Sequence, residues 1–428
     1  MLRPGNVELG AAKTAAGVAC SSLAKKPPSV VRIGVVVCPA ITASDARSRS
    51  RATSSGGRPA ESRSSRQNRS RPVSAPPPFW GGWDAGSPPT LDTGQQERRS
   101  MMADGSPPAL HVPARDIPVP ASVSAQAQAF LAQGLMRTSP RPSLDDLDAW
   151  RKTIAATEDA MLPMYEQRAS RVAADIAEID AEGTRVYVVT PDGTLGDDRR
   201  VFLDVHGGAL IQGGGETCRL NAIATAGQVG ARTWAVDYRM PPDHPYPTPL
   251  DDCVSAYRAI LRDHRPDEVI VGGGSAGANL AAALILRARD EGLPLPAAAV
   301  LLTPELDLTE SGDSFQTNAA VDIVGSQSLI PVNLLYADGH DLAHPYLSPL
   351  FGDFVKGFPP TLLTAGTRDV FLSNAVRMHR ALRTAAIPAE LHIFEAAPHG
   401  GFFGTAPEDG EVDRQVRQFV DTCWARSN

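Results

Sequence analysis

Gly273-Gly274-Ser275-Ala276-Gly277 is the stretch that decides the fold of this 428-residue sequence. The apolar run Val269-Ile270-Val271 precedes it, and the helix-forming run Ala278-Asn279-Leu280-Ala281-Ala282 follows it. A short strand, a glycine-rich corner and a helix are the context that a G-x-S-x-G nucleophile elbow requires. In such an elbow the serine has a strained backbone, an exposed hydroxyl and a helix N-terminus aimed at the reacting carbonyl. The stretch therefore predicts Ser275 as a nucleophile.

The glycines at the two ends of the elbow are expected for a steric reason. A side chain at Gly273 or Gly277 would collide with the neighbouring strand or helix. The pentapeptide alone is a weak signal, because it occurs by chance in many proteins. Its weight comes from three further motifs in the right order along the chain.

A second glycine motif, His206-Gly207-Gly208-Ala209, follows the apolar strand predicted at 200–205. Two consecutive glycines let the backbone approach a ligand closely and point both N–H groups at one spot. This suits an oxyanion hole, in which fixed donors stabilise the charge that develops on a carbonyl oxygen. An ordinary glycine turn is the alternative for this motif alone, and the elbow downstream favours the oxyanion hole. His206 itself is expected to shape the loop rather than to transfer protons.

The proline-rich loop 236–247, after the next strand, is expected to be rigid and to buttress the site.

A serine nucleophile needs a base, and the base needs a carboxylate to orient it. His399 directly follows the last predicted strand, so its loop can bring the imidazole over the elbow. Asp369 ends the preceding strand and is the predicted acid. Asp307, after the strand predicted at 297–303, is the alternative acid.

The sequence predicts no metal site. His340 and His344 are four residues apart, as metal ligands on a helix are. However, Gly339 and Pro345 flank the pair and no glutamate follows His340, so a zinc-protease motif is rejected.

From about residue 112 onward, strands are predicted to alternate with helices. Strands are expected at 184–190, 200–205, 233–237, 268–271, 297–303, 361–365 and 390–394, and helices at 249–263, 276–290, 373–385 and 409–424. This alternation predicts a mostly parallel sheet covered on both faces, with the active site at the carboxyl ends of the strands.

Two segments do not fit the alternation. They are the block 112–175, with helices expected at 122–135 and 143–168, and the stretch 309–345. Both are expected to fold over the strand ends as a cap, which excludes water and shapes the substrate pocket.

Charge is distributed unevenly along the chain. Residues 1–100 contain 15 Lys and Arg against 6 Asp and Glu. Residues 1–110, rich in Arg, Ser and Pro, are expected to be disordered, because they cannot bury enough apolar surface. An Arg/Ser-rich arm can bind nucleic acid through phosphates, but we favour a start of translation at Met101 or Met102 and expect no nucleic-acid partner. The folded domain is then expected at 111–428.

The cellular location of the protein is predicted from its apolar runs and its cysteines. No run approaches the roughly 18–20 apolar residues that span a bilayer. Arg32 interrupts the one candidate for a secretory signal, at 30–41. The folded part contains Cys218, Cys253 and Cys423, an odd number without close spacing, which predicts reduced thiols. A cytoplasmic protein is expected.

Together, these motifs resemble the hormone-sensitive-lipase-like family of α/β-hydrolases, which includes bacterial carboxylesterases. The resemblance covers roughly residues 200–425 and weakens back to about residue 120. Serine, aspartate and histidine also occur here in the order that α/β-hydrolases use. The resemblance implies an α/β-hydrolase fold with a mostly parallel central sheet, helices on both faces and a helical cap.

The resemblance also implies a covalent acyl-enzyme mechanism without a metal or organic cofactor. Ser275 would be the nucleophile, His399 the base and Asp369 its partner. The oxyanion hole would be formed by backbone N–H groups of Gly207, Gly208 and Ala276.

The chain departs from the family pattern at three places. Ala209 stands where the family usually has a third glycine, and Gly274 where it often has Asp or Thr. Val370-Phe371 follow the acid in place of Pro-Leu. The expected substrates are short-chain carboxylic esters. The alternative is a lactone, since the chain is also similar to bacterial hydrolases of monoterpene lactones. Side chains next to the catalytic loops are predicted to line the pocket: Leu210, Ile211, Phe402 and Phe403.

Two other classes of function were weighed. The stretch 272–277 also satisfies the dinucleotide fingerprint G-x-G-x-x-G, which requires an acidic residue at the end of the next strand. Asp290 and Glu291 come too early for that, so an oxidoreductase is rejected. The other class is a non-catalytic small-molecule receptor on the same fold. The presence of His399 favours an enzyme.

Overall fold

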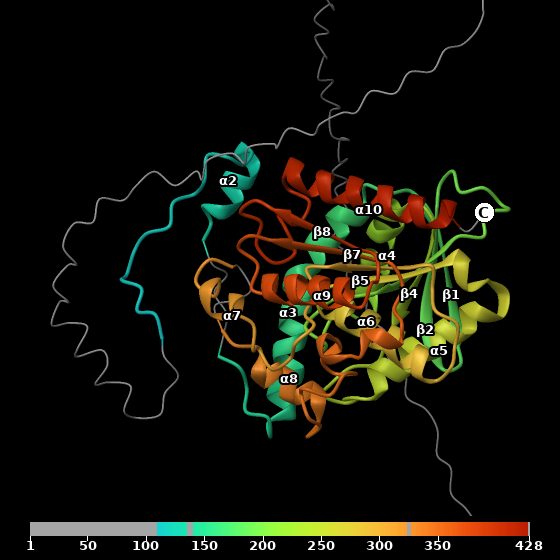
Figure 1. Cartoon of the computed structure of the whole chain (residues 1–428), viewed down its shortest axis with the longest axis horizontal. Coiled ribbons are helices and arrows are strands. Elements are labelled where there is room, and N and C mark those ends of the chain that lie inside the picture. The colour runs from blue at the N-terminus through green and yellow to red at the C-terminus, as the bar shows by residue number, and fades with distance from the viewer. Residues whose placement is uncertain (1–108, 135–139, 323–326, 427–428) are drawn as a thin grey trace, which may run out of the picture. The chain divides into compact units, whose positions relative to one another are not determined.

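The central feature of the fold is one sheet of eight strands in the order β1-β2-β4-β3-β5-β6-β7-β8 (Figure 1). The computed structural model describes residues 109–134, 140–322 and 327–426. The strands are β1 (Ala174–Ala181), β2 (Thr184–Pro191), β3 (Val201–Val205), β4 (Arg232–Asp237), β5 (Val269–Gly274), β6 (Ala298–Leu302), β7 (Thr361–Gly366) and β8 (Ala389–Phe394). Only the pairs β1–β2 and β2–β4 are antiparallel. The predicted, mostly parallel α/β sheet is confirmed.

Helices connect the strands and cover both faces of the sheet (Figure 1). They are α2 (Ala125–Leu131), α3 (Leu147–Ala169), α4 (Glu216–Val229), α5 (Thr248–Asp263), α6 (Ala276–Asp290), α7 (Ser314–Thr317), α8 (Ile330–Ala337), α9 (Leu372–Thr384) and α10 (Pro407–Ala425). Short 3₁₀ helices lie at Pro266–Glu268, Pro349–Phe351 and Phe354–Lys356.

The alternation of side chains along β3 shows how the two faces are built. Leu203 and its neighbours two residues away are buried in one cluster with α5, α6 and α9. Phe202 points to the other face and is buried against α10 and the end of α4. Because both faces are covered, all five residues of β3 are buried, as expected for a central strand of a parallel sheet.

The sequence analysis predicted neither β1 nor α4, nor the short helices α7 and α8 within the stretch 309–345. β1 is an edge strand whose Asp and Glu side chains leave most of it exposed, a composition that protects sheet edges but gives a weak strand signal. The buried face of α4 consists largely of small or polar residues such as Thr217, Cys218 and Ala222, so the apolar periodicity that marks a helix is faint. The helix predicted at 122–135 is shorter in the structure, where α2 runs from Ala125 to Leu131 after Ser124 as its N-cap.

The two segments predicted as a cap meet in one apolar cluster. Trp150 of α3 is buried there with Val332 of α8 and with Val370 and Phe371, which follow β7. Both segments thus reach the carboxyl end of β7. Residues 1–108, and with them nearly all of the predicted leader and Met101 and Met102, lie outside the described residues.

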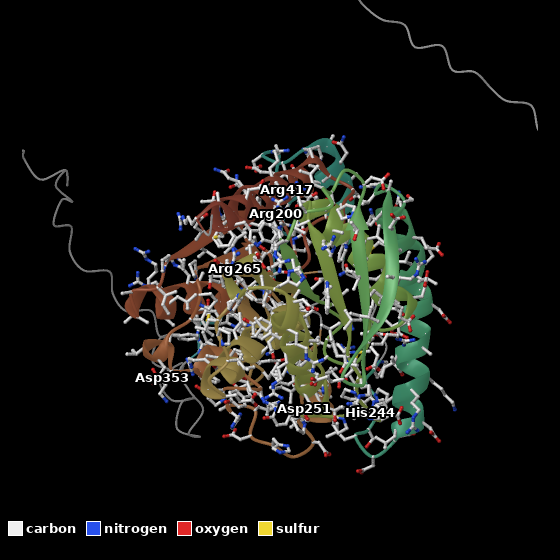
Figure 2. All side chains as sticks on the ribbon, turned by 90° about the vertical axis from the view of Figure 1, so that its right-hand side faces the viewer. Arg200, His244, Asp251, Arg265, Asp353 and Arg417 are labelled. Carbon is white, nitrogen blue, oxygen red and sulfur yellow. The ribbon has the colours of Figure 1, made fainter. Side chains whose placement is uncertain are left out.

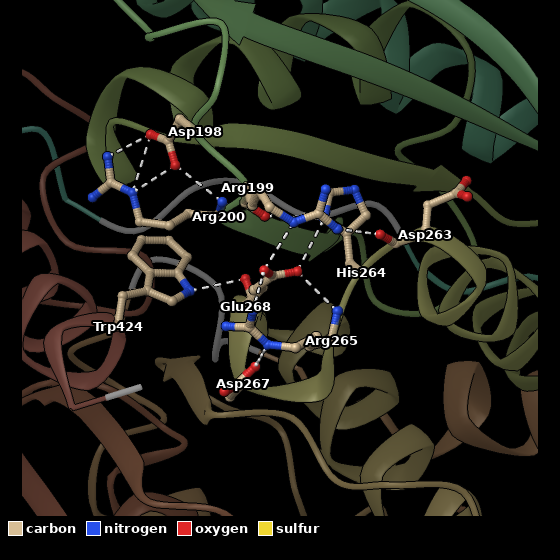
Figure 3. Close-up of polar contacts among 9 residues, drawn as sticks. All are labelled: Asp198, Arg199, Arg200, Asp263, His264, Arg265, Asp267, Glu268 and Trp424. Atoms are coloured by element: carbon tan, nitrogen blue, oxygen red, sulfur yellow. Dashed lines mark hydrogen bonds and ion pairs between the residues drawn. The ribbon is translucent and has the colours of Figure 1, made fainter. Parts of the chain in front are cut away.

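Charged networks close the opposite end of the sheet, where β5 begins. Glu268 accepts hydrogen bonds from the Arg199 guanidinium at 2.9 Å and from the Arg265 amide at 2.8 Å, and its carbonyl accepts from the Trp424 indole at 3.0 Å (Figure 3). Arg417 of α10, which is labelled in Figure 2, lies among the charged side chains of this part of the surface. Its guanidinium donates to the carbonyls of Gly227 and Gln228 near the end of α4, at 2.9 and 3.0 Å. A cation at a helix C-terminus is favourable, so this contact holds α10 against the end of α4.

Among the described residues, no helix combines the length and the apolar character needed to cross a membrane. Cys218, Cys253 and Cys423 are buried, and no disulfide joins any two of them. That their thiols are reduced stays a prediction.

Candidate active site

Ser275 occupies the sharp corner between β5 and α6. Its backbone has φ 57° and ψ −125°, a strained conformation for a residue with a side chain. The amide of Ser275 donates to the Leu302 carbonyl of β6 at 2.8 Å. A Cβ at either Gly273 or Gly277 would fall on the Val205 carbonyl oxygen of β3. The steric reason predicted for these two glycines is therefore confirmed.

The three predicted catalytic side chains come together. His399 Nε2 lies 2.8 Å from Ser275 Oγ, and His399 Nδ1 lies 3.3 Å from Asp369 Oδ1. Asp369 is fully buried, and its Oδ1 also accepts the Phe371 amide at 2.8 Å. The Phe371 ring meets the imidazole edge-on, with centroids 4.7 Å apart. This arrangement can pass a proton from the hydroxyl to an imidazole that a carboxylate orients.

The alternative acid, Asp307, is engaged elsewhere. Its carboxylate accepts from the Arg377 guanidinium and from the Ser311 hydroxyl, each at 2.6 Å. These contacts lower the pKa of Asp307 although its burial would raise it. The geometry therefore favours Asp369 as the partner of His399.

The electrostatic environment of His399 favours its charged form. Burial alone would lower the pKa of the imidazole, but the charge of Asp369, whose Oδ1 lies 3.3 Å from Nδ1, acts in the opposite direction. Asp322 and Glu305 add to this effect, and the net result is a raised pKa. The site is thus built to stabilise the imidazolium that forms when a base takes up a proton.

The glycine loop after β3 presents free amides next to the elbow. Gly208 has φ 124°, and the N–H groups of Gly207 and Gly208 have no acceptor among the described residues. Ala276 is the first residue of α6, where the helix itself supplies no acceptor for the N–H. These three amides therefore have no acceptor among the described residues, and their role as an oxyanion hole stays a prediction.

The loop predicted as a buttress contacts the glycine loop directly. Tyr238 donates its hydroxyl to the His206 carbonyl at 2.8 Å and stacks on the imidazole, with ring centroids 4.0 Å apart. His206 Nδ1 contacts the Gly207 carbonyl at 2.8 Å, and burial lowers the pKa of this histidine. These contacts hold the His206 ring against the glycine loop, which supports the expectation that it shapes the loop.

Two carboxylates that the sequence did not predict also hold the glycine loop. Glu158 of α3 accepts the Gly213 amide at 2.9 Å, and Asp237, which ends β4, accepts the Gly215 amide at 2.8 Å. The position of Asp237 at a strand end was a signal for a role near the site. Nothing in the sequence around Glu158 pointed to its contact.

His206, Cys218 and Asp237 form a cluster whose potential metal-binding atoms all lie within 4.8 Å of one another. The two carboxylate oxygens of Asp237 are already engaged, one by the Gly215 amide and the other by Arg185 at 2.6 Å. Burial also holds the pKa of Cys218 well above its usual range, so the thiol stays protonated. We assign no metal to this cluster.

Three of the four predicted pocket residues are buried in packed clusters. Leu210 lies in the main core, Ile211 packs with Trp150, and Phe402 meets Phe130 edge-on at 5.7 Å. Phe403 is partly exposed and also lies against Phe130, at 6.1 Å. Whether these side chains line a substrate pocket stays a prediction.

Comparison with known proteins agrees with this architecture. Residues 202–403 match the family model of the alpha/beta hydrolase fold. An acetyl-hydrolase of Streptomyces hygroscopicus is 39% identical over 204 residues, which are 47% of this chain and 67% of the relative. An esterase of Acinetobacter venetianus is 30% identical over 198 residues, which are 46% of this chain and 65% of the relative.

Solved structures match over a longer part of the chain. The crystal structure of one esterase superposes with a TM-score of 0.67 at 32% identity, over 73% of this chain and 98% of the esterase. An esterase of the bacterial hormone-sensitive lipase family superposes with a TM-score of 0.60 at 28% identity, over 70% of this chain and 99% of that esterase. The elbow, the glycine loop and these likenesses lead to one conclusion: the chain belongs to the hormone-sensitive-lipase-like family of α/β-hydrolases.

Proposed function

We propose that this protein is a serine carboxylic-ester hydrolase that cleaves short-chain esters through an acyl-enzyme on Ser275. The observation on which this rests is the 2.8 Å contact between Ser275 Oγ and His399 Nε2 at a strained elbow. The relatives and solved structures to which the chain is similar are named acetyl-hydrolase and esterase, which supports the proposal.

In the acylation step, Ser275 Oγ attacks the ester carbonyl carbon while His399 Nε2 takes up the hydroxyl proton. The carbonyl oxygen becomes an oxyanion that accepts hydrogen bonds from the amides of Gly207, Gly208 and Ala276. The tetrahedral intermediate then collapses, the C–O bond to the alcohol breaks, and His399 protonates the leaving oxygen. Asp369 stabilises the imidazolium between these two transfers.

Deacylation repeats these events with water as the nucleophile. His399 accepts a proton from the water as it attacks the acyl carbon, and then returns a proton to Ser275 Oγ when the acid leaves. The acid–base pair is used twice, so both steps depend on the same charge state of His399.

Replacing the nucleophile tests the proposal. We expect Ser275→Ala to lower kcat/KM for p-nitrophenyl acetate by roughly 10⁴-fold or more, because acylation loses its acceptor. The variant should keep the circular dichroism spectrum and melting temperature of the wild type. Unchanged turnover in a folded variant would refute the assignment of Ser275.

The substrate class follows from a panel of p-nitrophenyl esters of increasing chain length together with lactones. We expect short acyl chains to be preferred, and Leu210, Ile211, Phe402 and Phe403 to line the acyl pocket. A preference for long chains would contradict the short-chain proposal, and a higher kcat/KM for lactones would favour the lactone alternative. The proposal includes a cytoplasmic location, which is supported by buried Cys218, Cys253 and Cys423 forming no disulfide with one another.

A further inference from the structure

Asp322 is a buried carboxylate that contacts both loops of the acid–base pair. Its Oδ2 accepts the Val370 amide at 2.6 Å, and its Oδ1 accepts the His399 amide at 3.2 Å. The side chain is fully buried. Val370 directly follows the proposed acid, and His399 is the proposed base. One carboxylate thus links the backbones of the two residues that must cooperate.

The rest of the segment that contains Asp322, residues 314–321, contacts the loop of the acid and the start of α9. Ser314 donates its hydroxyl to the Val370 carbonyl at 2.6 Å, and the Asn318 side chain donates to the Asp369 carbonyl at 2.8 Å. Among the polar contacts of residues 314–322, only those of Asp322 reach the loop of His399. The link is therefore specific to this side chain.

A carboxylate suits this place better than a neutral group. Hydrogen bonds from N–H groups to an ionised acceptor are shorter and stronger than those to a neutral one. A buried charge that accepts from both loops resists changes in their separation, because either loop would leave an unpaired group if it moved away.

The charge of Asp322 also acts on the imidazole. After Asp369, it is the next carboxylate that raises the pKa of His399, ahead of Glu305. Glu305 has a pKa of about 7 because it is buried, and it interacts with Glu310 and Arg141. The remaining neighbour on the acid loop, the Phe371 ring, is uncharged.

We propose that Asp322 is a positioning residue, which sets the spacing of the acid and base loops and whose charge stabilises the imidazolium during turnover. This inference rests on the proposed roles of Ser275, Asp369 and His399. Asp322 does not touch the reacting atoms, so it acts through the histidine.

The test uses Asp322→Asn in the full-length protein with p-nitrophenyl acetate. The near-isosteric amide keeps one acceptor, loses the charge and turns an NH₂ group toward an N–H donor. We expect kcat to fall roughly 10- to 100-fold with KM changed less than about threefold, as for a misplaced catalytic group. The acid limb of the kcat/KM profile should move to lower pH, because the imidazolium loses one stabilising charge.

Asn318→Ala is the matched control, since it removes bonds to the acid loop without contacting the loop of His399. It should leave the acid limb at the wild-type pH. If Asp322→Asn keeps the wild-type kcat and acid limb while Ser275→Ala is inactive, the positioning role is refuted and the proposed function stands. If Ser275→Ala also stays active, the proposed function itself fails.

Should Asp322→Asn not fold, the same question can be put to the wild-type protein by NMR. Bonding to a buried carboxylate predicts low-field amide resonances for Val370 and His399 that exchange slowly with solvent. Rapid exchange of either amide would overturn the inference.

Discussion

At the scale of single residues, two buried aspartates near the strand ends, Asp369 and Asp307, have different partners and different roles. Asp369 has an imidazole as its neighbour at 3.3 Å, whereas Asp307 has a guanidinium at 2.6 Å. The first pairing can cycle between neutral and charged imidazole during turnover. The second is a permanent ion pair, because arginine stays protonated. The same residue type therefore serves catalysis at one position and structure at the other.

Parallel substitutions can separate these two roles. We expect Asp369→Asn to lower kcat by roughly 10³- to 10⁴-fold, since the amide no longer orients or stabilises the imidazolium, with a small change in melting temperature. Asp307→Asn should keep kcat within a few-fold but lower the free energy of unfolding, because Arg377 loses its partner. Steady-state kinetics and urea denaturation of both variants measure this. The reverse pattern would make Asp307 the acid.

At the scale of elements, the elbow depends on how closely β3, β5 and α6 approach one another. A Cβ at Gly277 would fall on the Val205 carbonyl and come within 2.6 Å of the His206 carbonyl oxygen. At Gly274 a Cβ would meet nothing nearer than the Leu302 carbonyl, at 3.8 Å. Gly277 therefore leaves no room for a side chain, whereas Gly274 does.

These two glycines provide a matched pair of variants. We expect Gly277→Ala to lower the free energy of unfolding by roughly 3 kcal/mol or more, because backbone atoms cannot move aside cheaply. Gly274→Ala should change stability by less than about 1 kcal/mol and keep most of the esterase activity. Urea unfolding curves of the two proteins decide the matter, and equal losses would show that packing at the elbow is looser than described.

At the scale of the whole molecule, stability depends on pH through an acid in the centre of the sheet. Asp204 of β3 is buried, and its pKa is raised to about 7 by burial, which hydrogen bonds from Thr225 and Asn221 only partly offset. In the unfolded chain the pKa of an aspartate is about 3.9. The folded protein therefore binds the proton more tightly, and its stability falls as pH rises from about 4 to about 7.

Asp204→Asn should remove this loss, because the amide resembles the protonated acid. Relative to the wild type, we expect the variant to gain about 2–3 kcal/mol of unfolding free energy between pH 5 and pH 8. Urea denaturation at the two pH values measures the change. Stability curves that run parallel for the two proteins would contradict it.

The sequence predicts this molecule well where the signal is local. The elbow and the strand ends that carry Asp369 and His399 follow from short patterns, because parallel strands bring their carboxyl ends to one edge of the sheet. β1 and α4 escape prediction because charged or small residues blur their periodicity. The role of Asp322 could not be predicted for another reason. Its partners are backbone amides 48 and 77 positions away, and every residue except proline has such an amide, so the sequence does not indicate which ones are bonded.

The bond between Glu158 and the Gly213 amide has a consequence for engineering. Exchanging α3 for the equivalent helix of another esterase is an obvious way to build a chimaera that accepts different esters. Such a graft would also remove a tether from the loop that bears Gly207 and Gly208. A transplanted helix should therefore retain an acidic side chain at position 158. Without it, a chimaera that accepts more esters would be expected to turn them over with a lower kcat.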